Sequence, residues 1–522
     1  MTYDYIIIGA GSAGCVLANR LTEDGKSEVL LLEAGGPDKK QEVSVPAAFS
    51  KMFRSEVDWA YETEPQAHLN DRQLFWPRGK MLGGSSSINA MIYQRGHPSD
   101  YDQWAKLGNE EWSYDDVLPY FKKSEHQERG ASTFHGTGGP LNVADLRDAN
   151  PLSKAFVEAG VQAGLKRNHD FNGVQQEGVG LYQVTQKKGA RHSAAVAYLK
   201  PVLKRANLHT ETFAQATKLR FDGTRCVGVT YLQDGRLHEA NVKREVLLCG
   251  GAINSPQLLL LSGIGDANHL KEMNIPVVMD LPGVGQNLQD HLAVLVGYEC
   301  TQKVSLAHAE GIGQLLKYLI LKKGMLTSNV GEAGGFVKLD PKSPAPELQY
   351  HFGPTFFSNH GFDNPDGDGF SIGPTLVRVK SRGHIKLRSA DPLAYPVIQP
   401  NYLEHEDDMD VMLQGVKLAR KIAHSPAFDA YRGKEYEPGV EVQSDDEIRA
   451  YLRRKAQSLY HPVGTCKMGV DPMAVVSPEL QVHGVQGLRV IDASVMPTVV
   501  NANTNAPTIM IAEKAADMIR KG

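Results

Sequence analysis

The chain has 522 residues, of which 41% are hydrophobic and 22% charged, and its formal net charge is −4. This length exceeds one ordinary core, so we expect two domains or an elaborated α/β fold. The balance of charge and the absence of a basic block argue against nucleic acid as a partner. Five scattered cysteines without a CxxC pair argue against a disulfide framework or a zinc site and fit a reducing compartment.

Neither a secretory signal nor a membrane-spanning segment is predicted. The chain starts Met-Thr-Tyr-Asp, which lacks a cationic leader, and its first apolar run belongs to a strand pattern. The most apolar window, 315–321, is shorter than the roughly 18 residues that a span requires. It is also interrupted by Lys317 and followed by Lys322 and Lys323. We therefore expect a cytoplasmic protein without a transmembrane segment, and peripheral contact with a membrane stays open.

A dinucleotide-binding pattern fills the first 36 residues. An apolar run at 5–8 leads into Gly9-Ala-Gly-Ser-Ala-Gly14, a helical pattern follows, and a second apolar run at 29–32 ends at Glu33. Strand, glycine-rich turn, helix, strand and acid in this order are the βαβ fingerprint of dinucleotide binding. The glycines let a pyrophosphate approach the backbone and the helix N-terminus offers free N–H groups, while Glu33 would accept hydrogen bonds from ribose hydroxyls. The pattern distinguishes neither NAD from FAD nor one reaction from another.

The next segments again combine glycine-rich turns with predicted strands and helices. A glycine-rich block occupies 79–89, and a polar helical region follows it. Apolar runs at 227–232 and 245–248 predict two strands, and the second leads into another glycine turn at Gly250. A helix is expected directly afterwards, over 255–261.

The middle of the chain, from about 300 to 455, changes character. Aromatic clusters and alternating segments such as 384–387 predict an antiparallel sheet, and a helix-rich stretch is expected from 407 to 424. A strand at 488–491 and a closing helix over 506–519 then show again the pattern of the nucleotide-binding domain. The chain is thus predicted to leave a nucleotide-binding domain, build a second domain, and come back.

Five blocks in this order resemble the glucose–methanol–choline (GMC) family of FAD-dependent oxidoreductases. They are the fingerprint, 79–89, 251–265, 284–291, and the C-terminal run from 460–469 through 503–508. The resemblance implies FAD rather than NAD. It also implies an α/β fold with a doubly wound, Rossmann-like FAD-binding domain, discontinuous over 1–298 and 456–522. An α+β substrate-binding domain, built on an antiparallel sheet, would occupy 299–455.

The resemblance further implies which residues meet the cofactor. The segment from Gly83 to Ile92 would lie along FAD, with backbone N–H groups of 89–91 near the flavin ring. In some relatives a histidine near this point links covalently to the flavin, whereas this chain has Ile88, so we predict non-covalent FAD. The predicted cofactor-binding residues are Gly9, Gly11, Ser12, Ala13, Gly14, Glu33, Ala34, Leu82, Gly83, Ser86, Asn89, Ala90, Met91, Ile92, Ala216, Gly250, Asp492, Ala493, Asn505 and Pro507.

Two residues near the C-terminus are the catalytic candidates. When hydride leaves an alcohol carbon, the hydroxyl proton must leave too, and imidazole is suited to accept it at neutral pH. His461 matches the family's catalytic histidine. Asn505 is expected to hold the alkoxide oxygen through its amide, since family members carry His or Asn here. Asn503 is expected to cap the closing helix.

Other titratable residues are given structural roles. His291 follows Asp290, but no third residue is spaced to complete a metal site with them, so no metal is expected. His351 lies in the variable middle region and is taken as unrelated to catalysis, as is His360. Glu332 could face a substrate cation, as a similar glutamate in choline-oxidising relatives would, but a structural acid is favoured.

The predicted reaction is oxidation of a primary alcohol to its aldehyde. His461 would accept the hydroxyl proton, Asn505 would hold the oxygen, and hydride would pass to flavin N5. O₂ or another acceptor would then reoxidise the flavin. The resemblance to bacterial choline- and alcohol-dehydrogenase-like members favours a dehydrogenase.

Three alternative activities on the same scaffold stay open. Choline oxidation would need an acid and an aromatic cage, which Glu332 and the aromatic residues of 350–357 could supply. A lyase that cleaves hydroxynitriles without net redox also fits a single histidine. A light-driven fatty-acid decarboxylase fits less well, because the chain retains His461 and has no cysteine between Cys300 and Cys466.

Overall fold

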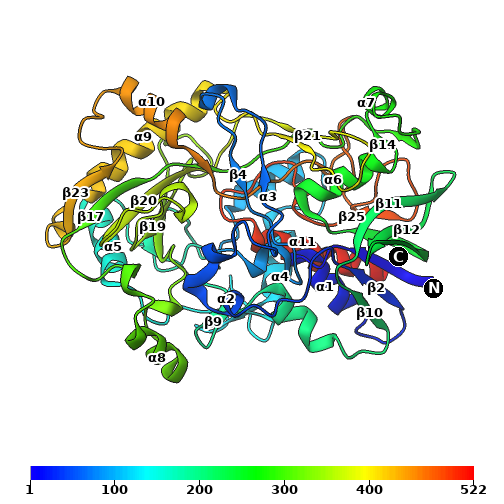
Figure 1. Cartoon of the computed structure of the whole chain (residues 1–522), viewed down its shortest axis with the longest axis horizontal. Helices are drawn as coiled ribbons and strands as arrows, with labels where there is room; N and C mark the ends of the chain where they lie inside the picture. The colour runs from blue at the N-terminus through cyan, green and yellow to red at the C-terminus, as the bar shows by residue number, and fades with distance from the viewer. Residues whose placement is uncertain (1, 522) are drawn as a thin grey trace.

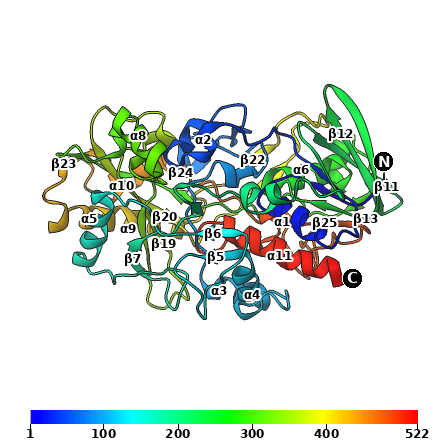
Figure 2. The same cartoon turned by 90° about the horizontal axis from the view of Figure 1, so that it is seen from below.

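A computed structural model describes residues 2–521 of the chain. The body has two regions, which lie at opposite ends of Figure 1. A sheet that begins with the N-terminal strand occupies the right of the view, where both ends of the chain lie, and a larger antiparallel sheet occupies the left. Figure 2 shows the same two regions from below, with the last helix running from the middle toward the right-hand end.

The first sheet has seven strands, and parallel pairing holds its centre. The strands, in spatial order, are β10 (Leu208–Glu211), β2 (Val29–Leu32), β1 (Thr2–Ile8), β13 (Arg236–Leu248), β12 (Arg225–Gln233) and β11 (Gln215–Asp222), with β25 (Leu488–Val490) also paired to β13. In β1, Ile6 pairs with Leu30 on one side and with Val246 on the other. All four residues of β2 are buried, which explains why this strand reads as a continuous apolar run rather than an alternating one.

The second sheet has eight strands and is antiparallel throughout. They are β23 (Arg432–Glu437), β17 (Val296–Cys300), β20 (Gly369–Leu376), β19 (Leu348–Gly353), β18 (Ala333–Val337) and β7 (Gly178–Leu181), with β16 (Leu292–Ala293) beside β20 and β24 (Gln457–Ser458) beside β16. Helices α5 (Pro151–Gln162) and α9 (Glu406–Ala423) pack on it. Leu348 and Met412 belong to the buried cluster that joins helix and sheet.

The remaining elements connect and cover these sheets. The other helices are α1 (Ser12–Leu21), α2 (Gln41–Ser44), α3 (Pro98–Lys106), α4 (Tyr114–Ser124), α6 (Gly251–Leu261), α7 (Ala267–Glu272), α8 (Ile312–Leu321), α10 (Asp445–Lys455) and α11 (Asn505–Lys521). Short strand pairs are β3 (Tyr61–Glu62) with β4 (Phe75–Trp76), β5 (Glu125–Gln127) with β6 (Leu141–Val143), β8 (Gln186–Lys187) with β9 (Ala190–Arg191), β14 (Ile264–Gly265) with β15 (Met279–Asp280), and β21 (His384–Lys386) with β22 (Val397–Gln399). Within 2–521, no helix is both long and apolar enough to span a bilayer.

The predicted fold class is confirmed, and so are the strands and helices that the sequence indicated. The segment at 384–387 does pair antiparallel, but in the separate two-stranded sheet β21–β22 rather than in the large one. Two elements that precede residue 298, α5 and β7, pack with the large antiparallel sheet. The sheets therefore cross the predicted boundary, and the division of the chain into two domains stays a prediction.

Candidate active site

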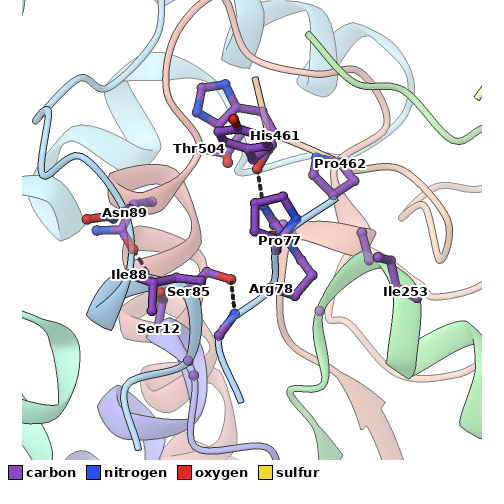
Figure 3. A pocket seen from close by; sticks show the side chains of 18 of the residues that line it. Ser12, Pro77, Arg78, Ser85, Ile88, Asn89, Ile253, His461, Pro462 and Thr504 are labelled. Carbon is purple, nitrogen blue, oxygen red and sulfur yellow. Dashed lines mark hydrogen bonds between the residues drawn. The ribbon is translucent and has the colours of Figure 1, made fainter. Parts of the chain in front are cut away.

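A cavity lies between the two sheets. Its wall includes Ile8, Leu32 and Leu248, which end the parallel strands β1, β2 and β13, as well as residues of the antiparallel strands β19 and β20. The carboxyl ends of parallel strands are where open α/β sheets bind ligands. Figure 3 shows His461 at one end of this cavity, with Ser12, Ser85 and Ile88 toward the other.

The glycine-rich turn lets three backbone segments meet at the floor of the cavity. Gly9 has φ +102°, and a Cβ there would lie 2.5 Å from the carbonyl oxygen of Cys249. A Cβ at Gly14 would lie 1.9 Å from the carbonyl oxygen of Gly9, and one at Gly84 would lie 2.8 Å from the Cα of Gly11. Helix α1 starts directly behind, and no side chain of the described chain caps its first turn. Its free N–H groups therefore suit an anionic group such as a pyrophosphate.

Glu33 closes the same end of the cavity at the tip of β2. Its Oε2 accepts a hydrogen bond from the N–H of Ala10 at 2.9 Å, and its Oε1 accepts one from the N–H of Gly35 at 2.8 Å. Burial raises the pKa of Glu33 to about 7, and the two N–H groups act in the opposite direction. A carboxylate fixed by backbone donors in this way keeps further lone pairs for ligand hydroxyls.

Asp492 and Asn89 fix two other parts of the wall. Asp492 Oδ2 accepts hydrogen bonds from the N–H of Gly251 at 2.8 Å and from the hydroxyl of Ser255 at 2.6 Å. Asn89 Oδ1 accepts one from the N–H of Met91 at 3.0 Å, and Met91 has a left-handed φ of +58°. These bonds hold backbone groups of both segments in set positions along the cavity.

Most of the predicted cofactor-binding residues line this single cavity. Those in its wall are Gly9, Gly11, Ser12, Ala13, Glu33, Ala34, Asn89, Ala90, Met91, Ile92, Ala216, Gly250, Asp492, Ala493 and Asn505. Five are not among the lining residues: Gly14, Leu82, Gly83, Ser86 and Pro507. Ser86, for example, donates its hydroxyl to the carbonyl of Gly83 and accepts from the N–H of Ala194, so it supports the turn behind the wall.

The backbone before His461 is strained and firmly held. Tyr460 has a left-handed φ of +68°, which a bulky residue rarely adopts. Its N–H donates to Ser458 Oγ at 2.8 Å, and its carbonyl accepts a hydrogen bond from the Arg78 guanidinium. The next N–H, that of His461, donates to Asp290 Oδ1 at 2.6 Å. Strain that several bonds enforce is typical of functional sites.

The imidazole of His461 lies between two partners. Its Nδ1 is 3.0 Å from Nδ1 of His291, and the two rings are perpendicular with centroids 5.1 Å apart. Its Nε2 is 3.3 Å from the side-chain nitrogen of Asn503, whose Oδ1 accepts from the Gln349 amide at 3.1 Å. That second bond identifies the donor end of the Asn503 amide. Because an amide nitrogen only donates, we assign the lone pair of His461 to Nε2 and its proton to Nδ1.

The surroundings keep both rings neutral. Burial lowers the pKa of His461 well below its usual value, and His291, His351 and Arg78 lower it further. Burial also lowers the pKa of His291 to about 3. A neutral His291 can accept a hydrogen bond from the Nδ1–H of His461, which leaves the lone pair of His461 at Nε2, beside the Asn503 amide, as the base.

The structure places Asn503, rather than Asn505, against His461. Asn505 begins α11, and its Oδ1 accepts a hydrogen bond from Ser12 Oγ at 2.7 Å, at the start of α1. Asn505 therefore lies with the glycine-rich turn. The two asparagines line the same cavity, but it is Asn503, expected to be only a helix cap, that has its amide beside the imidazole.

The positions of three further residues bear on the sequence-based expectations, and two of the positions differ from them. His351 lines the cavity instead of standing apart from it, and His291 bonds directly to His461. Glu332 is buried and accepts hydrogen bonds from the Asn150 N–H and from the hydroxyls of Ser153 and Ser328. Glu332 is therefore a structural acid, as favoured. No spacing in the sequence links His291 to His461. The one sign of a role for His291 in the sequence is that it lies in the block 284–291, which resembles the family.

Comparison with known proteins agrees with this geometry. Two family models, both described as GMC oxidoreductase, match residues 3–293 and 379–512. Alcohol dehydrogenase (acceptor) from Pseudomonas putida is 50% identical, over 99% of this chain and 95% of its own length. Mitochondrial choline dehydrogenase from Mus musculus is 48% identical, over 99% of this chain and 89% of its own length. The chain belongs to the GMC oxidoreductase family.

Solved structures extend the match to the whole fold. Pyridoxine 4-oxidase from Mesorbium loti superposes with a TM-score of 0.92 at 31% identity, over 99% of both chains. Formate oxidase from Aspergillus oryzae, solved to study the modification of its FAD, gives a TM-score of 0.94 at 27% identity, over 100% of this chain and 98% of its own. The predicted FAD-dependent oxidoreductase of the GMC family is thus confirmed, and these matches support action on a CH–OH donor.

Proposed function

We propose that this GMC oxidoreductase oxidises a neutral primary alcohol to its aldehyde at the His461 end of the cavity. The observation that carries the proposal is the pairing of His461 with Asn503, whose side-chain nitrogen lies 3.3 Å from the imidazole Nε2 at the cavity wall. A neutral base and an amide donor side by side are what removal of a hydroxyl proton requires.

The proposed roles follow from the assigned proton positions. Nε2 of His461 accepts the hydroxyl proton of the alcohol, while its Nδ1–H stays donated to His291. The Asn503 amide then donates to the alkoxide oxygen and stabilises the charge that develops on it. Asp290 fixes the backbone of His461, so the ring keeps its position as its charge changes.

The glycine-rich end of the cavity fits FAD. The close approach of Gly9, Gly11 and Gly84 leaves backbone N–H groups at the start of α1 for the pyrophosphate, and we propose Glu33 for the ribose. When bound, FAD supplies the acceptor of two electrons. We propose that it is held without a covalent bond, because Ile88 offers no nucleophile where the cavity wall passes the 84–92 segment.

The charges of the cavity favour a neutral alcohol over choline. Among the residues described, the acids in its wall are Glu33 and Asp492, and both already bind backbone N–H groups at the glycine-rich end. Near His461 the wall carries Arg78, a cation. Its other residues there include Phe49 and Phe357. In the described wall a quaternary ammonium would meet this like charge with no carboxylate beside it, since Asp290, which binds the His461 backbone, is not a wall residue. The rings would attract a cation too, so the discrimination depends on Arg78, whereas an apolar alcohol chain would pack on the rings without meeting a like charge.

Anaerobic mixing of the yellow holoenzyme with alcohols tests the reaction. We expect primary alcohols with apolar chains, aliphatic or aromatic, to bleach the absorption band of oxidised flavin, and choline to bleach it far more slowly at equal concentration. If no alcohol reduces the flavin, the proposal is wrong and a reaction without net redox takes its place. Bleaching by choline alone would refute the assignment of a neutral substrate.

Two further measurements address the cofactor bond and the acceptor. Precipitation with trichloroacetic acid should leave all flavin in the supernatant, and a yellow pellet would refute non-covalent binding. Repeating the reduction in air and measuring peroxide separates an oxidase from a dehydrogenase. We propose a dehydrogenase, as the relative from Pseudomonas putida is named. The cytoplasm stays the predicted compartment, and the five free cysteines fit it.

A further inference from the structure

Helix α8 presents its aliphatic side chains to solvent. Ile312 is 79% exposed and Ile320 is 74% exposed, while Leu315, Leu316, Leu319 and Leu321 are 46–56% exposed. Exposed apolar residues scattered singly are ordinary, but a contiguous group marks an interaction site. In Figure 1 the helix projects from the lower margin of the molecule, and Figure 2 shows it beside α2 on the same face.

These side chains form one stripe that points away from the protein. Positions 312, 315, 316, 319 and 320 recur at helical spacing and share one face, which we call the apolar stripe. The opposite face holds the helix in place. Tyr318 is buried, its hydroxyl lies 3.5 Å from the carbonyl of Ser44, and Gln314 Oε1 accepts from the N–H of Met325 at 3.2 Å. The apolar stripe therefore lies on a helix that contacts with the rest of the protein hold in a fixed position.

Cations gather at the C-terminal end of the stripe. The turn between β8 and β9 meets the end of α8, because a Cβ at Gly189 would lie 2.6 Å from the carbonyl oxygen of Lys322 and 3.2 Å from Cδ of Arg147. The basic residues brought together there are Arg147, Lys187, Lys188, Lys322 and Lys323, which we call the basic rim.

Two acids near the helix are paired with lysines. Asp148 binds Lys317 at 2.9 Å, and Glu310 binds Lys51 at 2.5 Å beyond the other end of the stripe. Glu42, on the neighbouring α2, is the further exposed acid on an adjacent element. Although the whole chain has a formal net charge of −4, the surface at the end of the stripe is positive.

We propose that α8 docks this enzyme on the surface of an anionic phospholipid membrane. An aliphatic stripe flanked by lysines is the pattern of a helix that lies in the interface of a bilayer. Ten residues span roughly 15 Å, half of the hydrocarbon core, so the helix lies on the membrane and does not cross it. Anionic headgroups would balance the basic rim. A second copy of the chain, docked with the two helices parallel, would instead bring two basic rims together. An antiparallel dimer would separate the rims, and light scattering distinguishes it from docking on a membrane.

The docked helix is continuous with the wall of the active site. After α8 the chain makes a turn at 325–327, which packs on the turn at 46–52, and then reaches the cavity at Val330 and Gly331. Phe49, in the second of these turns, also lines the cavity. Docking through α8 would therefore hold this side of the cavity near the lipid surface, where apolar alcohols concentrate.

Flotation of the FAD-loaded enzyme with vesicles tests the docking. We expect binding to vesicles of phosphatidylcholine mixed with phosphatidylglycerol and much weaker binding to pure phosphatidylcholine. The variant Ile312→Ser/Leu316→Ser/Ile320→Ser should bind the mixed vesicles about a hundredfold more weakly or worse, because three apolar side chains no longer leave water. Lys322→Gln/Lys323→Gln should weaken binding by about tenfold and reduce its sensitivity to salt.

A matched control replaces exposed apolar residues elsewhere. Val174→Ser/Leu237→Ser/Val470→Ser removes side chains that are 68–90% exposed but scattered, and it should bind vesicles like the parent. Flavin reduction by a water-soluble alcohol should be unchanged in all variants, which separates this test from the proposed reaction. Failure of the parent to bind mixed vesicles, or equal binding by the stripe variant, would overturn the proposal. So would a dimer in light scattering that the stripe variant dissociates.

Discussion

At the Glu33 end of the cavity, backbone groups form the floor: those of the βαβ segment, with the backbone at Cys249 and Gly84 beside them. At the His461 end, the site consists of side chains from four separate segments. The antiparallel sheet and the segment before α11 bring them together; they are His291, His351, His461 and Asn503. The first end depends on glycines that leave room for a ligand. The second depends on hydrogen bonds between buried side chains and on strained backbone.

This difference separates two kinds of failure. Damage to the glycine-rich end should lower the affinity for FAD and leave the chemistry of bound flavin intact. Damage to the His461 end should leave FAD bound and slow its reduction.

The largest effect is expected for His461→Ala. Without Nε2 the hydroxyl proton has no acceptor, so flavin reduction by a primary alcohol should slow by about 10²–10⁴-fold. The FAD content of the purified variant should equal that of the parent. Anaerobic stopped-flow absorbance measures the first quantity, and the ratio of flavin to protein absorbance the second. His209→Ala, on the exposed surface of β10, is the control and should change neither.

A pair of variants then decides between the two asparagines. Asn503→Ala removes the amide at Nε2 of His461 and should slow reduction on the order of 10²-fold, as loss of one donor to a developing oxyanion does. Asn505→Ala removes the partner of Ser12 and should mainly weaken FAD binding. Reduction rates are measured with saturating FAD, so that affinity does not enter. A slow Asn505→Ala beside a normal Asn503→Ala would return the catalytic role to Asn505.

The same division explains how much the sequence could predict. The βαβ pattern is local, because its two apolar runs, its glycines and its acid all lie within 36 residues, and its strands and helix lie where the sequence predicts them. In Asn501-Ala-Asn-Thr-Asn505 the backbone is irregular until α11 begins, so spacing alone did not tell which amide faces His461. The partnership of His291 with His461 depends on β16 and β24 pairing across the chain. In the sequence, the apolar window at 315–321 resembles a core segment. Only the folded structure shows that its aliphatic side chains face solvent.

Glu33→Gln probes the cofactor end. The carboxylate accepts from two backbone N–H groups, and an amide would turn a donor toward one of them. Leaving a buried donor unpaired costs about 1–3 kcal/mol, so the FAD dissociation constant should rise about tenfold or more. Fluorescence titration of apoprotein with FAD gives this constant, and Glu28→Gln, which precedes β2 at its exposed end, is the matched control. A slower reduction at saturating FAD would mean that the two ends are coupled.

The smallest effect is the response to pH, and it tests the His461 end without a substitution. A base acts in its unprotonated form, so its contribution is complete above its pKa and disappears as the pH falls through it. Burial and the neighbouring His291, His351 and Arg78 lower the pKa of His461 well below 6.5. We therefore expect kcat/KM for a primary alcohol to change little from about pH 8 to about pH 6.5 and to fall only at lower pH. FAD is kept saturating and its content is measured at each pH, because burial raises the pKa of Glu33 to about 7 and its carboxylate therefore takes up a proton within this range. A fall centred at pH 6.5 or above would mean that burial and the neighbouring groups do not lower the pKa of His461, and it would contradict the neutral, buried ring of this structure.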